Sequence, residues 1–261
     1  MPRFKLLIEY GGTRYRGWQI QKNARTVQGE IDRAVREVSK RREFELYGSG
    51  RTDAGVHALA QVAHLELYTD LPPDTLRRKL NDELPSDIHI RAIQTVPHRF
   101  HARHDAVSRC YLYQISRRRT AFGKSIVWWI REPLDVGAMR TAAAAFVGMK
   151  DFRAFTDDEP EEKSTRVLVD AIEIVESGAL ILIRVQGSHF LWKMVRRMVG
   201  VLAAVGRGDL RPSDAARLLH DEDSSAPAAL AAPAAGLFLE AVLYRGDDGP
   251  GPIRPVLNVG D

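Results

Sequence analysis

Residues 47–58 have the sequence YGSGRTDAGVHA. Three glycines bracket Arg51 and Asp53, between segments that predict strands near 43–47 and at 59–68. Glycine permits tight turns and close ligand approach, and a charged loop tip between strands is a common place for a reactive group. The segment lacks the ending of a phosphate-binding loop and leads into a strand, which excludes a dinucleotide fingerprint. Spacing alone also fits an ordinary hairpin loop, in which Asp53 caps a turn and Arg51 pairs with it.

This loop lies within a regular order of predicted elements across the N-terminal half of the chain. Alternating apolar side chains predict strands, and apolar side chains at intervals of three or four predict helices. Thr26 is placed to cap the first helix. The predicted elements are strand 3–10, helix 27–39, the two strands beside the loop, a helix carrying Leu76, Leu80 and Leu84, and strand 88–96.

The C-terminal half repeats this β-α-β-β-α-β order with one additional helix. Its predicted elements are strand 107–116, helix 135–147, strands 167–176 and 179–186 joined at Ser177-Gly178, helices 189–205 and 212–220, and strand 237–244. Each half matches the split-βαβ, ferredoxin-like pattern. We therefore predict an α/β (α+β) protein of two similar halves, whose sheets join or face each other and leave a cleft.

These repeats and the local composition predict the domain boundaries. An N-terminal α/β domain covers residues 1–105 and carries Asp53, and a C-terminal α/β domain covers 106–245. Residues 246–261 contain four glycines and three prolines, which predict a flexible tail. The acidic segment 156–164 predicts a mobile loop.

The composition is that of an ordinary globular protein, with 44% hydrophobic and 28% charged residues among 261. No apolar run approaches the ~20 residues of a membrane span, and the charged N-terminal stretch does not fit a signal peptide. A single cysteine, Cys110, excludes an internal disulfide and a cysteine-cluster metal site. This cysteine usage favours a reducing cytoplasm.

Positive charge is concentrated in the N-terminal part of the chain. The net charge is +4, but residues 1–120 hold 22 basic and 14 acidic side chains, whereas residues 121–261 hold 16 and 20. Arginine, the more frequent basic residue here, suits both phosphate contact and base stacking. The asymmetry favours a nucleic-acid partner, although a solvated arginine-rich surface is an equally valid interpretation.

The strand at 107–116 places basic and aromatic side chains on one face. Arg109, Tyr111 and Tyr113 alternate and so share a face. Such a face suits phosphate contact and base stacking. Half-buried tyrosines are also common in sheets, so this strand alone does not establish RNA binding.

Within residues 187–200, apolar side chains that include Val195 predict the buried stripe of the helix 189–205. Arg196 lies about 100° round the helix from Val195, at the border of the stripe, from which it can reach a buried carboxylate. Lys193 and Arg197 are predicted to point outward, toward phosphate or water.

Three histidines, His98, His101 and His104, are spaced by three close to Arg99 and Arg103. A zinc site would need a helix face and a further ligand, and this segment follows a strand and resembles a loop. We therefore predict a basic, RNA-contacting loop and no metal site.

Several motifs in sequence order resemble those of one family, the TruA family of tRNA pseudouridine synthases. The loop GRTDAGVHA is similar to the signature loop of that family, and the likeness extends over nearly the whole chain. The other motifs are Tyr10-Gly11-Gly12, Gly17-Trp18-Gln19 with Gln21, Thr26-Val27-Gln28, Phe100-His101-Ala102-Arg103, Arg109 with Tyr111 and Tyr113, Phe190-Leu191 with Met194-Val195-Arg196, and Gly236-Leu237-Phe238-Leu239.

The resemblance implies a pseudouridine synthase fold with a long mixed sheet and a basic cleft, a homodimer, and a tRNA substrate. It implies isomerisation of uridine in the anticodon stem-loop, at about positions 38 to 40, without a cofactor. By the same resemblance Asp53 is the nucleophile, Arg196 its ionic partner, and Tyr111 the residue that stacks on the target uracil.

We expect Arg51 to fill the gap left by the flipped-out base. Further RNA contacts are expected from Arg109, His101, Arg103, Lys193 and Arg197. The alternative is a non-catalytic RNA-binding module, which would use the same arginines and tyrosines but would not need Asp53.

Overall fold

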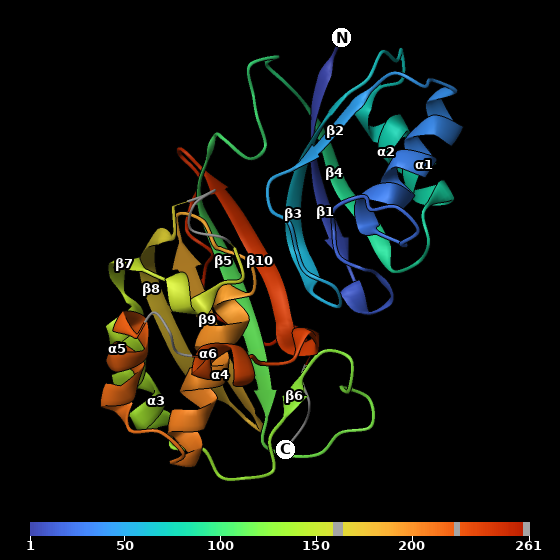
Figure 1. The fold of residues 1–261 in the computed structure, drawn as a ribbon. Helices are drawn as coiled ribbons and strands as arrows, with labels where there is room; N and C mark the ends of the chain where they lie inside the picture. Colours follow the sequence, from blue (N-terminus) through green and yellow to red (C-terminus); the bar gives the residue numbers. More distant parts are fainter. Residues whose placement is uncertain (159–163, 222–224, 258–261) are drawn as a thin grey trace. The chain divides into compact units, whose positions relative to one another are not determined.

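A computed structural model of the chain describes residues 1–158, 164–221 and 225–257, which divide into two compact units (Figure 1). Unit 1 comprises Met1–Val107 with Phe238–Gly249, and unit 2 comprises Ser108–Leu237 with the segment that begins at Pro250. Each unit combines a sheet with helices, which confirms the α/β class predicted from the sequence.

Unit 1 has the predicted β-α-β-β-α-β order. Its elements are β1 (Arg3–Tyr10), the short 3-10 helix η1 (Gly12–Arg14), α1 (Val27–Ser39), β2 (Glu45–Gly48), β3 (His57–Glu66), α2 (Pro73–Glu83) and β4 (Ile88–Val96). The central strand β1 pairs antiparallel with β3 and β4, and β2 pairs antiparallel with β3. Figure 1 shows α1 and α2 together on one side of this sheet. This is the pairing of a ferredoxin-like unit.

The local signals in unit 1 work as the sequence predicts. Alternate side chains of β1 are at most 4% exposed, namely Phe4, Leu6, Ile8 and Tyr10. Thr26 accepts a hydrogen bond at Oγ1 from the backbone N–H of Gly29 at 3.2 Å, so the predicted cap of α1 is confirmed. The buried face of α1 carries Ile31 and Val35.

The last strand, β10 (Leu237–Tyr244), groups with unit 1 rather than with the C-terminal half. Phe238 pairs in parallel with His57, and Leu239 with Ala58. β2 pairs with β3 only from Ala63 onward, so the edge of β3 at 57–58 is left for β10. The two units divide the chain at 107/108 and 237/238, and the predicted boundaries at 105/106 and 245/246 stay a prediction.

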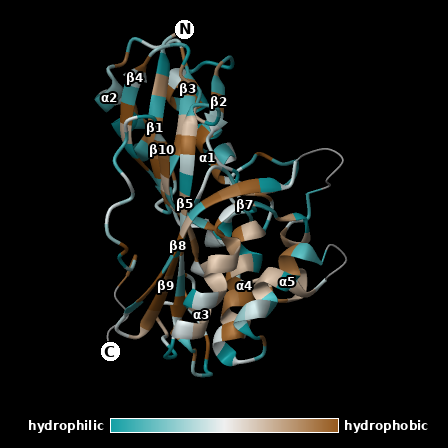
Figure 2. Ribbon diagram, turned by 90° about the vertical axis from the view of Figure 1, so that its left-hand side faces the viewer, coloured by the Kyte–Doolittle hydropathy of each residue, from teal (hydrophilic) through white to brown (hydrophobic). Residues whose placement is uncertain are grey.

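The strands of unit 2 pair in the order β5-β9-β8-β7, with antiparallel neighbours. These strands are β5 (Ala106–Ser116), β7 (Gly148–Asp151), β8 (Arg166–Ser177) and β9 (Leu180–Gly187), and β6 (Trp128–Trp129) pairs in parallel with β5. Its helices are α3 (Val136–Ala143), α4 (Met194–Arg207), α5 (Pro212–His220) and α6 (Ala226–Ala229), with 3-10 turns η2 (Ala144–Phe146), η3 (Arg153–Phe155) and η4 (Ala234–Gly236). Helix α4 is mostly pale to brown in Figure 2, in keeping with its many buried residues.

Two predicted segments of unit 2 differ in the structure. The predicted helix 189–205 begins only at Met194, because Lys193 has a left-handed backbone (φ 62°) and the residues before it form a loop. Strands β6 and β7 are missed because they are only two and four residues long. The predicted hairpin turn at Ser177-Gly178 is confirmed, with Gly178 at φ 54°.

The described part of the predicted flexible tail is held to unit 2 by two buried polar side chains. The guanidinium of Arg184, 2% exposed, donates from Nη1 to the carbonyl of Gly251 at 2.9 Å. The side-chain oxygen of Gln114, fully buried, accepts from the N–H of Val256 at 2.7 Å. Buried polar groups require partners, and the end of the chain supplies them. Most of the predicted mobile loop 156–164, its residues 159–163, lies outside the described residues.

Candidate active site

The loop that carries Asp53 joins β2 to β3 and is fixed by hydrogen bonds from β3. The N–H of Ser49 donates to the carbonyl of Val62 at 2.7 Å. The side-chain amide of Gln61, fully buried, bonds both polar groups of Gly50: its Nε2 donates to the carbonyl at 2.8 Å and its Oε1 accepts from the N–H at 3.2 Å. This pair of bonds sets the backbone path before Arg51 and Asp53.

The second half of the loop is a tight turn that exposes alternate side chains. The N–H of Val56 donates to the carbonyl of Asp53 at 3.1 Å, and Gly55 has a φ of 79°. A positive φ is costly for residues other than glycine. Arg51 is exposed, Thr52 is buried and Asp53 is half-buried, so the loop presents Arg51 outward and keeps the Asp53 carboxylate partly shielded.

A segment near the start of the chain, residues 10–18, holds the same loop through backbone hydrogen bonds. The N–H of Trp18 donates to the carbonyl of Thr52 at 3.1 Å, and the carbonyl of Tyr15 accepts from the N–H of Gly55 at 3.2 Å. Asp53 is therefore fixed by main-chain bonds on both its N-terminal and C-terminal sides.

Two glycines make this close backbone approach possible. A Cβ at Gly12 would lie 1.9 Å from the carbonyl oxygen of Val56, and one at Gly17 would lie 2.4 Å from that of Thr52. Gly17 also has a φ of 97°. Trp18, 1% exposed, packs beside Gly48, where an added Cβ would lie 2.5 Å from the indole. The sequence motifs around Gly12 and Gly17 thus allow close backbone packing against the Asp53 loop.

The side chain of Thr52 is anchored within unit 1. Its Oγ1 lies 2.7 Å from the hydroxyl oxygen of Tyr10, and both side chains are buried. Burial raises the pKa of the Tyr10 hydroxyl above its ordinary value despite its bonds to Thr52 and Gln61. Tyr10 therefore remains protonated and links the loop to the centre of the sheet.

His57, the first residue of β3, organises the turn at Gly12. Its Nδ1 accepts a hydrogen bond from the N–H of Gly12 at 3.1 Å, and its ring stacks on that of Phe238 with centroids 4.8 Å apart. His57 is 3% exposed. The motifs at Gly12, His57 and Phe238 are thus parts of one packed structure.

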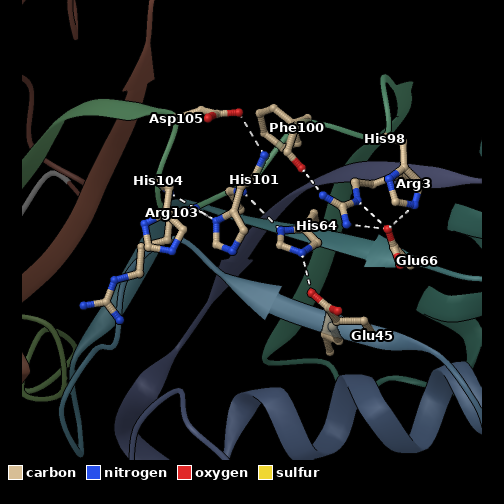
Figure 3. A network of polar contacts seen from close by, with 12 residues as sticks. Arg3, Glu45, His64, Glu66, His98, Phe100, His101, Arg103, His104 and Asp105 are labelled. Carbon is tan, nitrogen blue, oxygen red and sulfur yellow. Dashed lines mark hydrogen bonds and ion pairs between the residues drawn. The ribbon is translucent and has the colours of Figure 1, made fainter.

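The predicted basic loop around His101 rests on a buried histidine (Figure 3). The Nδ1 of His64 accepts from the N–H of Ala102 at 3.1 Å, so its Nε2 carries the proton and donates to Oε1 of Glu45 at 2.9 Å. His64 is fully buried, and its ring centroid lies 4.8 Å from that of His101. The buried His64 ring therefore packs against His101 and supports the loop that carries it.

His101 itself shapes the turn rather than pointing freely outward. Its Nδ1 accepts from the backbone N–H groups of Arg103 and His104, both at 3.1 Å. Burial, followed by the neighbouring charges of His104 and His64, lowers the pKa of His101 below its ordinary value. Arg103 and His104 are exposed and can meet a ligand.

In unit 2, strand β5 carries the predicted aromatic and basic face, but its arginine is internal. Arg109 is 9% exposed and donates from Nη1 to the carbonyl of Ser188 at 2.8 Å. Tyr111, also 9% exposed, meets Phe190 edge to face with ring centroids 5.2 Å apart. Tyr113 is buried and donates to the carbonyl of Pro233 at 2.7 Å. Arg109 therefore positions the loop that carries Phe190 against Tyr111.

Arg196 is half-buried on the first turn of α4, as its border position predicts. Its Nε donates to the carbonyl of Ala232 at 2.7 Å, and the N–H of Ala232 donates to the Arg196 carbonyl at 2.9 Å. This two-way bond fixes the side chain. Its positive charge also acts on the buried hydroxyl of Tyr113.

The outward orientation predicted for Arg197 is wrong. Arg197 is 4% exposed, forms an ion pair with Asp157 and donates from Nη1 to the carbonyls of Ala154 and Thr156 at 3.2 and 2.8 Å. Lys193, half-buried, donates to the same Asp157 carboxylate at 2.6 Å. The predicted apolar stripe with Val195 is buried, but residues 154–157 also cover the Arg197 side of α4, so that Arg197 points inward.

Neither a metal site nor a membrane segment is found in the described parts of the chain. Among the described residues, no group of three or more His, Cys, Asp or Glu side chains could hold a metal ion. No helix in the described ranges has the length and apolar character needed to cross a membrane.

Comparison with known sequences agrees with the family resemblance of the motifs, and it does so over nearly the whole chain. The sequence model of the tRNA pseudouridine synthase family matches residues 6–105 and 142–245. The chain belongs to this family. Among curated relatives, tRNA pseudouridine synthase A of Pseudothermotoga lettingae is 39% identical over 93% of this chain and 99% of the relative. The enzyme of the same name from Paramagnetospirillum magneticum is 40% identical over 95% and 98%.

A third relative, tRNA pseudouridine synthase A of Rhodopseudomonas palustris, is 41% identical over 94% of this chain and its own full length. Among solved structures, a Cbf5-Nop10-Gar1 complex aligns with 76% of this chain and 54% of that chain at 12% identity. Its TM-score is 0.35, which is too low to support an argument. As a tRNA pseudouridine synthase family member, the chain is an isomerase that converts uridine to pseudouridine in tRNA.

The candidate catalytic residues lie in both units. Asp53 and Arg51 belong to unit 1, and Tyr111 and Arg196 belong to unit 2. The sequence assigned no role to Tyr10, Gly12, Gly17, Trp18 or Gln61, although each of them fixes the Asp53 loop. The glycines within the family motifs could have revealed this support, because glycine allows two backbone segments to come close together.

Proposed function

We propose that this chain isomerises uridine in the anticodon stem-loop of tRNAs, at about positions 38 to 40, with Asp53 as the nucleophile. The observation that carries the proposal is the placement of one half-buried carboxylate on a loop fixed by main-chain bonds on both sides. Such fixation suits a group that must attack one atom of a bound nucleotide, because misplacement of the reacting atoms slows the reaction strongly.

The isomerisation balances without an external reactant. The N1–C1′ bond breaks, the uracil turns, the C5–C1′ bond forms, the C5 proton leaves and N1 takes up a proton. No electrons enter or leave, so the chemistry needs no redox cofactor. Asp53 can attack C1′, attack C6 or remove the C2′ proton, and each route requires the ionised carboxylate.

By the family resemblance, two residues of unit 2 are also proposed to act in catalysis. Tyr111, braced edge to face by Phe190, stacks on the target uracil and assists removal of the C5 proton. Arg196, oriented by Ala232, supplies a positive charge for Asp53, and such a charge lowers the pKa of a carboxyl.

The proposed RNA contacts fall into two groups. Arg51 and Arg103 are exposed and meet the RNA directly, with Arg51 filling the gap left by the flipped base. Lys193, which forms an ion pair with Asp157, is proposed to contact a phosphate as well. His101 and Arg109 act by shaping their loops, and buried Arg197 supports the start of α4. We further propose a cytoplasmic homodimer, in keeping with the family resemblance and with cysteine usage.

The experiment is a pseudouridine-specific chemical map of tRNA after incubation with wild-type protein, Asp53→Asn or Asp53→Ala, with EDTA present. Wild type should modify the stem-loop, whereas both variants should bind tRNA within about twofold of wild type and lose about 10³-fold or more in rate. Multiple turnover by Asp53→Ala would remove Asp53 from the mechanism. Binding without any modification by wild type would instead favour the non-catalytic RNA-binding alternative.

A second measurement distinguishes the routes open to Asp53. Deuterium at C2′ of the target uridine should slow the reaction severalfold if Asp53 removes that proton. An unchanged rate on the deuterated substrate would exclude a rate-limiting C2′ deprotonation and leave attack at C1′ or C6.

A further inference from the structure

The segment of residues 117–131, which we call the 117–131 surface, presents basic and aromatic side chains without a carboxylate. Its sequence is RRRTAFGKSIVWWIR. Phe122 is 98% exposed and Trp129 is 42% exposed. The same segment contains five basic residues, and large exposed apolar side chains that gather on a surface mark interaction sites.

Hydrogen bonds to β5 give this segment a defined shape. The N–H of Ile130 donates to the carbonyl of Ser116 at 3.0 Å, and Oγ of Ser116 donates to the carbonyl of Arg118 at 2.7 Å. The buried amide of Gln114 donates to the carbonyl of Ile126 at 3.0 Å. A ligand therefore meets a surface that is already ordered, which lowers the entropic cost of binding.

The two adjacent tryptophans have opposite environments. Trp128 is half-buried, with its ring centroid 6.2 Å from that of Tyr113. Trp129 points the other way, as neighbours on a strand do, and the guanidinium of Arg119 lies 5.7 Å from its ring centroid. An exposed indole beside a guanidinium is the combination on which unpaired bases stack.

The positive charge of this surface is only partly compensated. Arg117 pairs with Glu176 at 2.7 Å. Beside Trp129 lies an open cavity of about 550 Å³, also lined by Arg131, Glu132, Arg207 and Asp209.

Of the two carboxylates that line that cavity, Asp209 is already paired, since Arg207 lies 2.7 Å from it, and Glu132 directly follows Arg131 in the chain. Lys124 and Arg131 are exposed and form no ion pair with any described residue.

We propose that the 117–131 surface binds a single-stranded or unpaired part of the tRNA substrate, with a base on Trp129 and phosphates at Arg119, Lys124 and Arg131. The proposal rests on the proposed function. Ser116 lies five residues beyond Tyr111 on β5, about 17 Å along an antiparallel strand. The bound nucleotides are therefore not the target uridine, and their contribution belongs to binding rather than to the chemical step.

The test measures the Kd for full-length tRNA and the rate of pseudouridine formation for Trp129→Ala, Phe122→Ala and a Lys124→Ala/Arg131→Ala double variant. Trp129→Ala should raise Kd and KM about tenfold, equivalent to about 1.4 kcal/mol, and leave kcat unchanged, as expected for a contact equally strong in ground and transition states. The double variant should reduce the slope of log Kd against log salt by about 1.5. Phe122 is almost fully exposed, so its variant cannot fail to fold and should weaken binding severalfold.

Tyr68→Ala is the matched control, because Tyr68 is 59% exposed and lies under Arg41 at 5.5 Å, outside this surface. It should bind and react like wild type. Unchanged Kd and salt slope in all three variants would overturn the proposal, and so would a change of oligomeric state in Trp129→Ala with tRNA affinity intact, which would identify a protein interface. If wild type binds tRNA but makes no pseudouridine, the proposed function fails, while the Kd comparison still tests this surface.

Discussion

The hydroxyl oxygen of Tyr10 lies 2.7 Å from Oγ1 of Thr52, the residue immediately before Asp53. Tyr10 ends β1 and Thr52 lies in the loop after β2, so the bond ties the candidate nucleophile to the central strand of unit 1. Both side chains are buried, and a hydrogen bond between buried partners resists exchange with water. The position of Asp53 thus depends on residues that never touch the RNA.

Tyr10→Phe should therefore impair catalysis through the position of the loop. The variant leaves the Thr52 hydroxyl without this partner, at a cost of about 1 kcal/mol in unfolding free energy. We expect kcat to fall about three- to tenfold with KM within about twofold of wild type. Steady-state kinetics and thermal melts check this, with Tyr68→Phe as an exposed control. An unchanged kcat together with lowered stability would show that Tyr10 has a structural role alone.

Gly17→Ala should displace the Asp53 loop. The new Cβ would lie 2.4 Å from the Thr52 carbonyl oxygen, at a backbone φ of 97°. We expect a loss of about 2–3 kcal/mol in unfolding free energy, together with most of the activity. Gly249→Ala, where an added Cβ meets nothing within 4 Å, should stay within about 0.5 kcal/mol of wild type. Chemical denaturation of both variants measures the difference, and equal stability would contradict the backbone clash.

Asp157→Asn should destabilise unit 2. Burial raises the pKa of the Asp157 carboxyl, but the hydrogen bond from Lys193 and the charge of Arg197 outweigh it, so the pKa lies below its ordinary value. The substitution leaves a buried guanidinium whose Nε already lacks a hydrogen-bond partner among the described residues. We expect a cost of about 2 kcal/mol, less than for a fully buried pair because Asp157 is one-third exposed.

The same ion pair has a defined pH dependence. A carboxyl whose folded pKa is lowered contributes stability above its unfolded pKa and loses that contribution as the pH falls through the folded value. Wild type should therefore lose more stability than Asp157→Asn as the pH decreases below about 4. Parallel melting curves for the two proteins over that range would contradict the assignment.

His101 should make the stability of unit 1 depend on pH just below neutrality. Because its folded pKa is lowered, the unfolded chain holds more protons in the window just below the ordinary value of about 6.5. Unfolding free energy should then decrease as the pH falls through that window. His101→Asn retains an acceptor for the N–H groups of Arg103 and His104 but does not titrate, so its melting temperature should fall less between about pH 7 and pH 5. Identical profiles would exclude His101 as the titrating group.

Arg51→Ala should separate base flipping from general RNA affinity. Arg51 is exposed on the loop, so its removal should change stability by less than about 0.5 kcal/mol. Flipping a paired base costs a few kcal/mol, so modification of a structured stem-loop should slow at least about tenfold more than modification of an unpaired target. Arg78→Ala, an exposed arginine on α2, should affect neither substrate. Equal slowing of both substrates by Arg51→Ala would sink the flipping role.

Local sequence patterns predicted most elements closely, because each pattern is settled by neighbours within a few residues. Strands β1, β4 and β10 and helices α1 and α5 begin and end where the sequence predicts. The start of α4 was missed, since apolar spacing continues through Leu191 into a loop that Lys193 terminates with a positive φ. Arg197 was assigned to the outer face because apolar spacing along α4 does not show that residues 154–157 cover this side of the helix.

The sequence by itself determined the two β-α-β-β-α-β repeats, the glycine-flanked Asp53 and the family motifs, because periodicity and short motifs are local properties. Tertiary structure alone decided what those motifs hold. Gly12, Gly17 and Tyr10 meet the Asp53 loop from about 40 residues away, β10 joins β3, and Arg184 takes its partner from Gly251. Such contacts depend on which hydrogen-bond partners buried polar groups find across the fold and on where backbone segments pack closely. The spacing of residues along the chain does not predict them.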